Sequence, residues 1–251
     1  DYPAVFGWEL GGLETGADRS IDDVPFAEIT RLLCAAYGRG AVNTVSWHPQ
    51  NPESGASAWD GKTSTAVSSI LPGGANHAQF RLWLDRLAGF FVGLKSADGT
   101  CVPVLFRPFH EHTGSGFWWG EAQCTPDEYK ALWRFTVEYL RDVKGVHNLL
   151  YVYSPDLYRD AEHYTERYPG DEWVDVLGLD AYHRPQDWDF LSGGERMLST
   201  LQRLGHEHGK PTAFTETGLE GIPDTAWWTR RLLPVLGRKE MQKKRIQEET
   251  T

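Results

Sequence analysis

The sequence predicts a (β/α)8 TIM-type barrel, on the basis of chain length, of alternating strands and helices, and of polar residues at the strand ends. The chain has 251 residues, which fits one barrel-sized domain better than two ordinary domains. Short apolar runs alternate with helical patterns, which indicates a parallel sheet covered by helices. A doubly wound open sheet is the alternative. No strand is followed by a glycine-rich nucleotide-binding motif, so the barrel is favoured.

Six segments of the chain are predicted as strands, because each is short, apolar and rich in β-branched or aromatic residues. Together they cover residues 5–10, 42–48, 102–111, 149–154, 174–182 and 212–216. A closed barrel of this type has eight strands. Two strands, taken to be the first and the last, are therefore not recognised in the sequence.

Helical periodicity fills the intervals between the strands. Apolar residues recur at helical spacing near residues 26–36, 80–94, 132–140, 197–204 and 226–236. Thr125, Pro126 and Glu128 predict a helix start, since they supply an N-cap, a proline at the first helical position and a capping box. Residues 49–76 are rich in Gly, Pro, Ser and Asn, and we expect them to form a long functional loop.

The chain is predicted to divide into a catalytic barrel, residues 1–236, and a charged tail, residues 237–251. The tail has almost no apolar positions, which is typical of a solvated extension. No run of about 18 apolar residues occurs, so no membrane-spanning segment is predicted. No signal peptide is recognised either.

The charge balance indicates which partners the protein avoids. The net charge is −10 and the isoelectric point is near 5.4. An acidic surface repels nucleic-acid phosphates and anionic membranes, so neither is an expected partner. A neutral polymer is the easier partner. The three cysteines have no zinc-site spacing, and no thiolate metal site is predicted.

Polar or aromatic side chains end all six predicted strands. In a barrel these carboxyl ends converge on the face that carries the active site. The residues concerned are Trp8 and Glu9, Trp47 and His48, His110 and Glu111, Tyr153 and Ser154, Asp180 and Tyr182, and Glu216.

Glu111 and Glu216 are the candidate catalytic residues. Each ends an apolar strand and is expected to be partly buried, and burial raises a carboxyl pKa. A second carboxylate nearby separates the two pKa values, which gives one protonated acid and one ionised nucleophile. Glycosidic cleavage requires such a pair. The alternative is that each glutamate pairs structurally with Arg107 or a lysine.

Other polar and aromatic residues near these glutamates are candidates for binding substrate. His48 and His110 are placed to donate hydrogen bonds to sugar hydroxyls. A metal site built from these histidines together with Asp180, His112 and His183 is a weaker alternative, and no metal or cofactor is predicted. Trp118 and Trp119 lie in a glycine-flanked loop that looks like a poor core element and a good platform for a sugar ring.

The motif Arg107-Pro108-Phe109-His110-Glu111 resembles glycoside hydrolase family 26, the β-mannanase family. The resemblance extends along nearly the whole chain and in a constant order. The other segments that carry it are residues 6–9 (FGWE), 45–49 (VSWHP), 117–120 (FWWG), 178–182 (GLDAY) and 214–218 (FTETG).

The resemblance implies a fold, an activity and roles for particular residues. Glu111 would be the acid/base and Glu216 the nucleophile of a retaining enzyme, with carboxyl groups about 5–5.5 Å apart. His48, His110 and Tyr182 would line the subsite of the reacting sugar. Asp180, at the end of the same predicted strand as Tyr182, is likewise predicted to bind substrate. Trp118 and Trp119 would shape the cleft. No metal is required by this chemistry.

The expected activity is therefore that of a retaining endo-β-1,4-mannanase acting on β-mannan or galactomannan. Cleavage of mixed-linkage β-1,3-1,4-glucan or β-1,3-xylan by the same mechanism is an alternative, and so is a carbohydrate-binding protein without turnover. A monomer exported from a bacterium, to the periplasm, the cell surface or the medium, is expected from the family.

Two departures from the family pattern stand out. The six predicted strands correspond to the family's second through seventh strands, and the first and last have no match in this sequence. An open barrel would expose two unpaired sheet edges. We therefore expect either a truncated form or a barrel that closes by another route.

Overall fold

The computed structural model describes residues 3–184 and 189–237 and contains one parallel sheet. Its six strands follow each other in sequence order, β1-β2-β3-β4-β5-β6, and every neighbouring pair is parallel. All six predicted strands are present, most of them trimmed at the ends. They are β1 (Val5–Glu9), β2 (Val42–Trp47), β3 (Val104–Pro108), β4 (Leu149–Tyr153), β5 (Val176–Asp180) and β6 (Thr212–Glu216).

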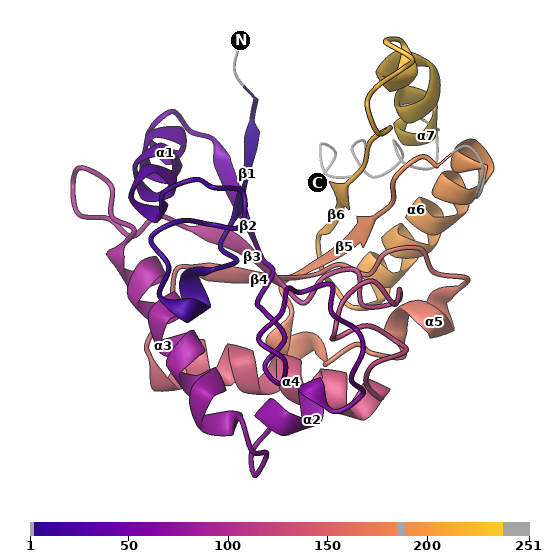
Figure 1. Cartoon of the computed structure of the whole chain (residues 1–251). Helices are drawn as coiled ribbons and strands as arrows, with labels where there is room; N and C mark the ends of the chain where they lie inside the picture. The colour runs from indigo at the N-terminus through magenta and orange to yellow at the C-terminus, as the bar shows by residue number, and fades with distance from the viewer. Residues whose placement is uncertain (1–2, 185–188, 238–251) are drawn as a thin grey trace.

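Helices connect the strands and lie along the outside of the curled sheet, with β1 and β6 at its two edges (Figure 1). The long helices are α1 (Phe26–Gly38), α3 (His77–Gly93), α4 (Pro126–Glu138) and α6 (Phe190–Glu207). The short ones are α2 (Ala66–Ile70), α5 (Ala161–Thr165) and α7 (Leu233–Leu236), with 3-10 turns at η1 (Leu13–Thr15) and η3 (Asp171–Trp173) and π-helical turns at η2 (Tyr139–Val143) and η4 (Trp228–Leu232). This is the strand-helix alternation that the sequence predicts.

Helix α4 begins at the residue that its sequence predicts. The backbone N–H of Glu128 donates to the Thr125 side chain at 3.3 Å, and the Glu128 carboxylate accepts from the Thr125 N–H at 2.8 Å. Pro126 occupies the first turn, where no backbone donor is needed. The predicted capping box is therefore confirmed.

The hydrophobic core lies between the sheet and the helices. Helix α3 buries one complete face against β2 and β3, and α4 and α6 do the same farther along the sheet. Residues 49–76, expected as a loop, include α2, and its three apolar residues Ala66, Val67 and Ile70 are fully buried. This segment is thus anchored to the core rather than lying free on the surface.

The two edge strands, β1 and β6, share a hollow with β2 and β3. A hollow of about 300 Å³ is lined by residues of β1, β2, β3 and β6, among them Glu9, Ser46, Arg107 and Glu216. The sheet thus brings residues more than 200 positions apart to one site. No helix within residues 3–184 and 189–237 is long and apolar enough to cross a membrane. Residues 238–251, nearly all of the predicted charged tail, lie outside the described part.

Candidate active site

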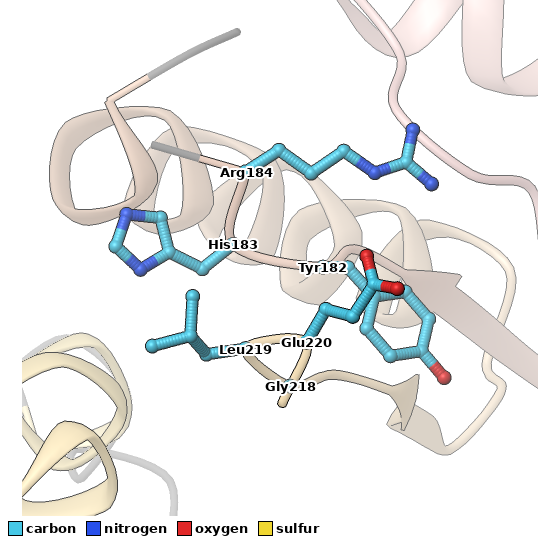
Figure 2. A pocket seen from close by; sticks show the side chains of 6 residues that line it. All are labelled: Tyr182, His183, Arg184, Gly218, Leu219 and Glu220. Atoms are coloured by element: carbon cyan, nitrogen blue, oxygen red, sulfur yellow. The ribbon is translucent and has the colours of Figure 1, made fainter. Parts of the chain in front are cut away.

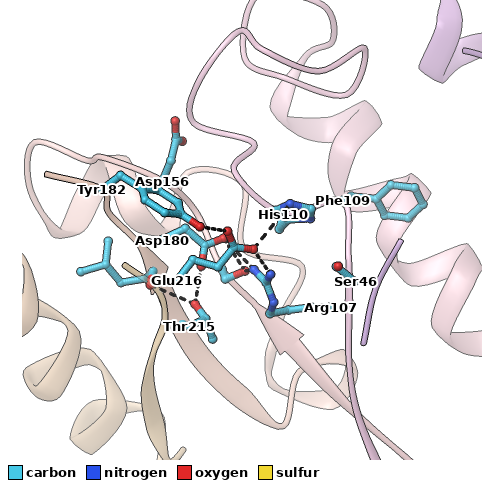
Figure 3. Close-up of polar contacts among 12 residues, drawn as sticks. Ser46, Arg107, Phe109, His110, Asp156, Asp180, Tyr182, Thr215 and Glu216 are labelled. Atoms are coloured by element: carbon cyan, nitrogen blue, oxygen red, sulfur yellow. Dashed lines mark hydrogen bonds and ion pairs between the residues drawn. The ribbon is translucent and has the colours of Figure 1, made fainter. Parts of the chain in front are cut away.

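Glu216 ends strand β6 and lies among three polar side chains from β3 and β5 (Figure 3). The Tyr182 hydroxyl donates a 2.8 Å hydrogen bond to its Oε2 atom. Arg107 donates from Nη2 to the other oxygen, Oε1, and His110 Nε2 lies 3.9 Å from the same atom. A quarter of the Glu216 side chain is still exposed, 26%. The carboxylate is thus held in one orientation, stabilised as an anion and open to a reactant.

Arg107 connects the nucleophile candidate to a buried network beneath it. Its Nη1 atom donates to Asp180 Oδ2 at 2.7 Å and to the Ser154 hydroxyl at 2.9 Å. Asp180 also accepts from Thr215 Oγ1 at 2.6 Å. Burial raises the pKa of Asp180, and the Arg107 guanidinium opposes that rise. The Asp180 side chain has no exposed surface, so it acts through Arg107 and not, as the sequence suggests, by direct contact with a substrate.

Glu111 lies in a strained turn directly after β3. Its φ is 53° and that of Phe109 is 49°, a left-handed region that residues with a side chain rarely adopt. Three bonds hold this backbone: Glu111 N–H to the Ser154 carbonyl at 2.9 Å, Trp119 Nε1 to the His110 carbonyl at 2.8 Å, and the Tyr129 hydroxyl to the Phe109 carbonyl at 2.8 Å. The surrounding fold therefore imposes the position of Glu111.

The electrostatic surroundings of Glu111 favour its protonated form. Burial, followed by the negative charges of Asp180, Asp156 and Glu216, raises the pKa of Glu111 to about 8. Asp156 follows β4 and accepts a hydrogen bond from Thr113, two residues beyond Glu111. Glu111 thus carries a proton at neutral pH. Glu216, in contrast, forms an ion pair with the Arg107 cation. One carboxyl is suited to donate a proton and the other to attack as an anion.

His110 and Tyr182 complete the surroundings of Glu216. Burial and the Arg107 charge hold the pKa of His110 well below its usual range, so its ring is neutral. Burial and the Glu216 charge raise the pKa of Tyr182, which keeps its hydroxyl as a hydrogen-bond donor. Tyr182 is 37% exposed and can reach a ligand, whereas His110 is 2% exposed.

His48 meets the same group from β2. Its ring lies edge-on to His110, with centroids 4.6 Å apart, and stacks on Trp59 at 5.2 Å. Its Nδ1 atom is 2.7 Å from Glu9 Oε2. Trp59, which is 55% exposed, is the aromatic residue beside this cluster that presents most of its surface to solvent.

Trp118 and Trp119 do not form the exposed platform that the sequence suggests. Neither side chain has exposed surface, and both belong to the hydrophobic core. Their indole N–H groups donate to the carbonyls of Pro49, at 2.9 Å, and His110, at 2.8 Å. The expectation that this loop is a poor core element is wrong, because the two rings fill the space behind the active-site turn. They shape the cleft from behind, and with no exposed surface they are not placed to contact a substrate directly.

A second hollow, also of about 300 Å³, lies beside Tyr182 between the segments that follow β5 and β6 (Figure 2). It is lined by Tyr182, His183, Arg184, Gly218, Leu219 and Glu220. A Cβ atom at position 218 would lie 3.3 Å from the Tyr182 ring, so glycine there lets the ring pack against the β6 segment. The hollow combines an aromatic face with charged groups, which suits a hydroxyl-rich ligand.

The structure brings together six of the eight residues predicted for the site, namely Glu111, Glu216, His48, His110, Asp180 and Tyr182. Sequence reasoning missed the roles of Glu9, Asp156 and Trp59. Two indications are available: Glu9 ends a predicted strand, and Trp59 lies in the 49–76 segment that is expected to be functional. Among the described residues, no group of three or more His, Cys, Asp or Glu side chains is arranged to hold a metal ion.

The site belongs to a defined class of protein. A parallel barrel-type sheet with two carboxyl groups at the carboxyl ends of two strands, one with a raised pKa and the other bonded to an arginine, is the arrangement of a barrel hydrolase that uses an acid and a nucleophile.

Comparison with known proteins gives the family. The family model described as Glycosyl hydrolase family 26 matches residues 1–194, a range that includes Glu111 and ends before Glu216. The chain belongs to glycosyl hydrolase family 26.

Individual relatives agree with this assignment. A mannan endo-1,4-beta-mannosidase from Bifidobacterium adolescentis is 40% identical over 233 residues, which are 88% of this chain and 23% of that protein. One from Bacillus subtilis is 34% identical over 87% of this chain and 59% of its own length. The chain thus spans less than two thirds of these curated relatives.

Solved structures resemble the chain over nearly its whole length. A GH26 beta-mannanase from Bacteroides ovatus is 46% identical with a TM-score of 0.91, over 96% of this chain and 70% of that one. A modular endo-beta-1,4-mannanase from Cellulomonas fimi is 39% identical with a TM-score of 0.86, over 95% of this chain and 55% of that one. The matched structures support the barrel-type fold.

Proposed function

We propose that this protein is a retaining endo-β-1,4-mannanase that hydrolyses β-mannan or galactomannan by double displacement. The observation that carries the proposal is the contrast between the two glutamates. Burial and negative neighbours keep Glu111 protonated, while Arg107 and Tyr182 hold Glu216 ready as an anion. The names of the relatives supply the choice of mannan among β-linked polysaccharides.

The first displacement uses both glutamates at once. A carboxylate oxygen of Glu216 attacks the anomeric carbon, and the bond from that carbon to the glycosidic oxygen breaks. Glu111 gives its proton to the departing oxygen, which leaves as the hydroxyl of the released sugar. The product on the enzyme is a glycosyl ester of Glu216, and Glu111 is left ionised.

The second displacement reverses the roles. Ionised Glu111 takes a proton from water, whose oxygen attacks the anomeric carbon and breaks the ester bond. Glu216 is released as a carboxylate and Glu111 is protonated again. Two inversions at one carbon give overall retention of configuration.

The remaining site residues fit the binding of a sugar chain. We assign Tyr182, His48 and His110 to the reacting sugar. Tyr182 and His110 lie directly against Glu216, and His48 contacts His110. The hollow beside Tyr182 and the exposed face of Trp59 offer surfaces for further sugars. Such an arrangement supports action on a polymer rather than on a single sugar.

The proposal is tested with the purified chain on four polysaccharides: β-1,4-mannan, galactomannan, mixed-linkage β-glucan and β-1,3-xylan. The expected result is release of reducing ends from the two mannans, with the β-configured product forming first in a proton NMR time course. Glu216→Ala should reduce turnover by at least about 10⁴-fold, since the attacking group is lost. Glu207→Gln, an exposed change on α6, is the matched control and should leave turnover unchanged.

Each other outcome overturns a definite part of the proposal. Cleavage of the glucan or xylan alone would keep the mechanism and remove mannan as the substrate. An α-configured first product would exclude retention. A folded protein that binds mannan without cleaving it would be a carbohydrate-binding protein.

We further propose that the protein works outside the cytoplasm, as a monomer. A polysaccharide is too large to enter a cell intact, so an enzyme that shortens it must meet it at or beyond the cell surface. Fractionation of the source cells tests the location, and light scattering of the purified chain tests the oligomeric state.

A further inference from the structure

Glu9, at the end of β1, is a buried carboxylate outside the proposed catalytic pair. Its side chain is 10% exposed, and its two oxygens accept four hydrogen bonds. Oε1 accepts from the backbone N–H groups of Gly11 and His48, the latter at 2.9 Å. Oε2 accepts from the Ser46 hydroxyl and from His48 Nδ1, both at 2.7 Å.

These bonds determine the charge of Glu9. Burial works to raise its pKa, but the hydrogen bonds and charge of His48, together with the Ser46 hydroxyl, outweigh that effect and lower it. An ionised carboxylate can only accept hydrogen bonds. The short contact between Glu9 Oε2 and His48 Nδ1 therefore requires a hydrogen on Nδ1.

The same contacts determine the orientation of the His48 ring. Glu9 holds one edge of it, and Trp59 stacks on the ring at an interplanar angle of 15°. His110 meets it edge-on at 89°, and Phe117 lies at a centroid distance of 5.2 Å. A ring held on these sides has one position, and its remaining nitrogen, Nε2, has a fixed place in the cleft.

The fixed ring is connected to the proposed nucleophile through one residue, His110. His48 touches His110, and His110 Nε2 is 3.9 Å from Glu216 Oε1. Glu9 is thus the outermost member of a row, Glu9, His48, His110 and Glu216, that crosses the site from β1 to β6. A carboxylate that fixes the tautomer of a histidine in this way sets which hydrogen bonds the ring offers to a bound group.

We propose that Glu9 is a positioning residue, which holds His48 with its hydrogen on Nδ1 and so presents Nε2 to a hydroxyl of the reacting sugar. The sugar part of this inference rests on the proposed function. The tautomer part does not, because it follows from the contacts of Glu9 alone.

The test compares Glu9→Gln with Glu14→Gln. Glu14 is a matched control: it is also a buried glutamate on the β1 side and accepts bonds from Gly12 N, Gln50 N and Trp47 Nε1 at 2.9–3.1 Å, but it makes no bond to His48 or Glu216. An amide at position 9 places a donor against Nδ1, which favours the other tautomer. Glu9→Gln should lower kcat/KM on mannan roughly 10–100-fold, as loss of a ligand-orienting partner does elsewhere. Glu14→Gln should change it less than about 3-fold.

The direct readout is the long-range proton–nitrogen NMR spectrum of the His48 ring. Wild type and Glu14→Gln should carry the hydrogen on Nδ1, Glu9→Gln should carry it on Nε2, and Glu9→Asp, which keeps the carboxylate, should restore Nδ1–H and part of the turnover. A bare Nδ1 in the wild type would overturn the inference even if no variant folds. Equal losses of kcat/KM in both glutamine variants with an unchanged tautomer would also overturn it. If the wild type cleaves no polysaccharide, the proposed function fails while the tautomer comparison still decides the role of Glu9.

Discussion

At the scale of single residues, the two proposed catalytic carboxyls differ through their neighbours and not through their own chemistry. Glu216 receives a hydrogen bond at each oxygen, from Tyr182 and from a cation, Arg107. Glu111 instead faces negative charges in a partly buried turn. The proposed roles of the two glutamates therefore depend on their neighbours: Arg107 stabilises the Glu216 anion, and Asp156 helps to raise the pKa of Glu111.

Removing the charge of Asp156 should make Glu111 a stronger acid. Burial raises the pKa of Asp156 to about 6, so above that pH it is a negative charge that raises the pKa of Glu111 from its ordinary 4.5. In Asp156→Asn that repulsion is lost, while asparagine can still accept the bond from Thr113. Glu111 then loses its proton at lower pH. The alkaline limb of the kcat/KM profile should move down by roughly half to one pH unit.

A matched control for this prediction lies in the same β4–α5 connection. Asp160 caps helix α5 by accepting from the His163 N–H at 2.9 Å, and asparagine caps equally well. Asp160→Asn removes the same charge without touching the Glu111 turn and should leave the pH profile in place. An unmoved alkaline limb in Asp156→Asn would show that Asp156 holds the turn without tuning the acid.

At the scale of the elements, strand β5 supports the site by close packing under Asp180. A Cβ atom on Gly178 would lie 2.7 Å from the Ser154 Cβ and 2.8 Å from the Thr215 hydroxyl oxygen. Both neighbours bond Asp180, which in turn holds Arg107. Glycine at this position therefore lets β4, β5 and β6 approach closely enough to assemble the network below the nucleophile.

Gly178→Ala should damage stability and turnover together. The added methyl group must displace Ser154 or Thr215, and overpacking of this kind costs about 1–3 kcal/mol in the free energy of unfolding. Because the displaced groups bond Asp180, kcat should fall as well. Chemical denaturation followed by tryptophan fluorescence measures the first effect and mannan hydrolysis the second.

The control for this change is another glycine-to-alanine substitution. Gly89, within α3, has nothing within 4 Å of its added Cβ. Gly89→Ala should raise the free energy of unfolding by about 0.5–1 kcal/mol, because alanine favours the helix, and should leave kcat alone. If Gly178→Ala keeps wild-type stability and activity, the prediction is wrong, and β4 and β6 can move apart to accommodate the methyl group without disturbing Asp180.

The elements themselves could be predicted because their causes are local. Strand β6 begins and ends at the residues that the sequence predicts, and α4 begins at its capping box. The burial of Trp118 and Trp119 could not be predicted, since it depends on carbonyl groups of Pro49 and His110 that only the fold brings near them. For the same reason the sequence indicates Glu111 and Glu216 as strand ends but not the left-handed backbone of Glu111.

At the scale of the whole molecule, every strand of the sheet contributes to one site. Glu9 and His48 come from the ends of β1 and β2, and Arg107 from β3. Strands β4, β5 and β6 supply Ser154, Asp180 with Tyr182, and Glu216. The site therefore gathers several ionisable groups in partly buried surroundings. Sites of this kind are expected to cost stability in exchange for function.

Glu111→Gln should remove part of this cost, so the variant should be more stable than the wild type by an amount that increases with pH. The folded-state pKa of Glu111, about 8, lies above its ordinary value of 4.5, so the folded chain binds this proton more tightly than the unfolded chain does. The stability that the protonated group provides is complete below about pH 4.5 and is lost as the pH rises toward 8. Glutamine resembles the protonated form at every pH and has no charge to bury.

The melting temperatures of the variant and the wild type should therefore agree near pH 4.5 and diverge above it. At pH 9 Glu111→Gln should be more stable by up to about 5 kcal/mol, which corresponds to a Tm difference on the order of 10 °C. Glu207→Gln, an exposed glutamate on α6, should show no such divergence. A constant difference in Tm from pH 4.5 to 9 would mean that Glu111 is ionised throughout this range. It could then not deliver the proton that the first displacement needs, so calorimetry at several pH values tests the proposed acid without any substrate.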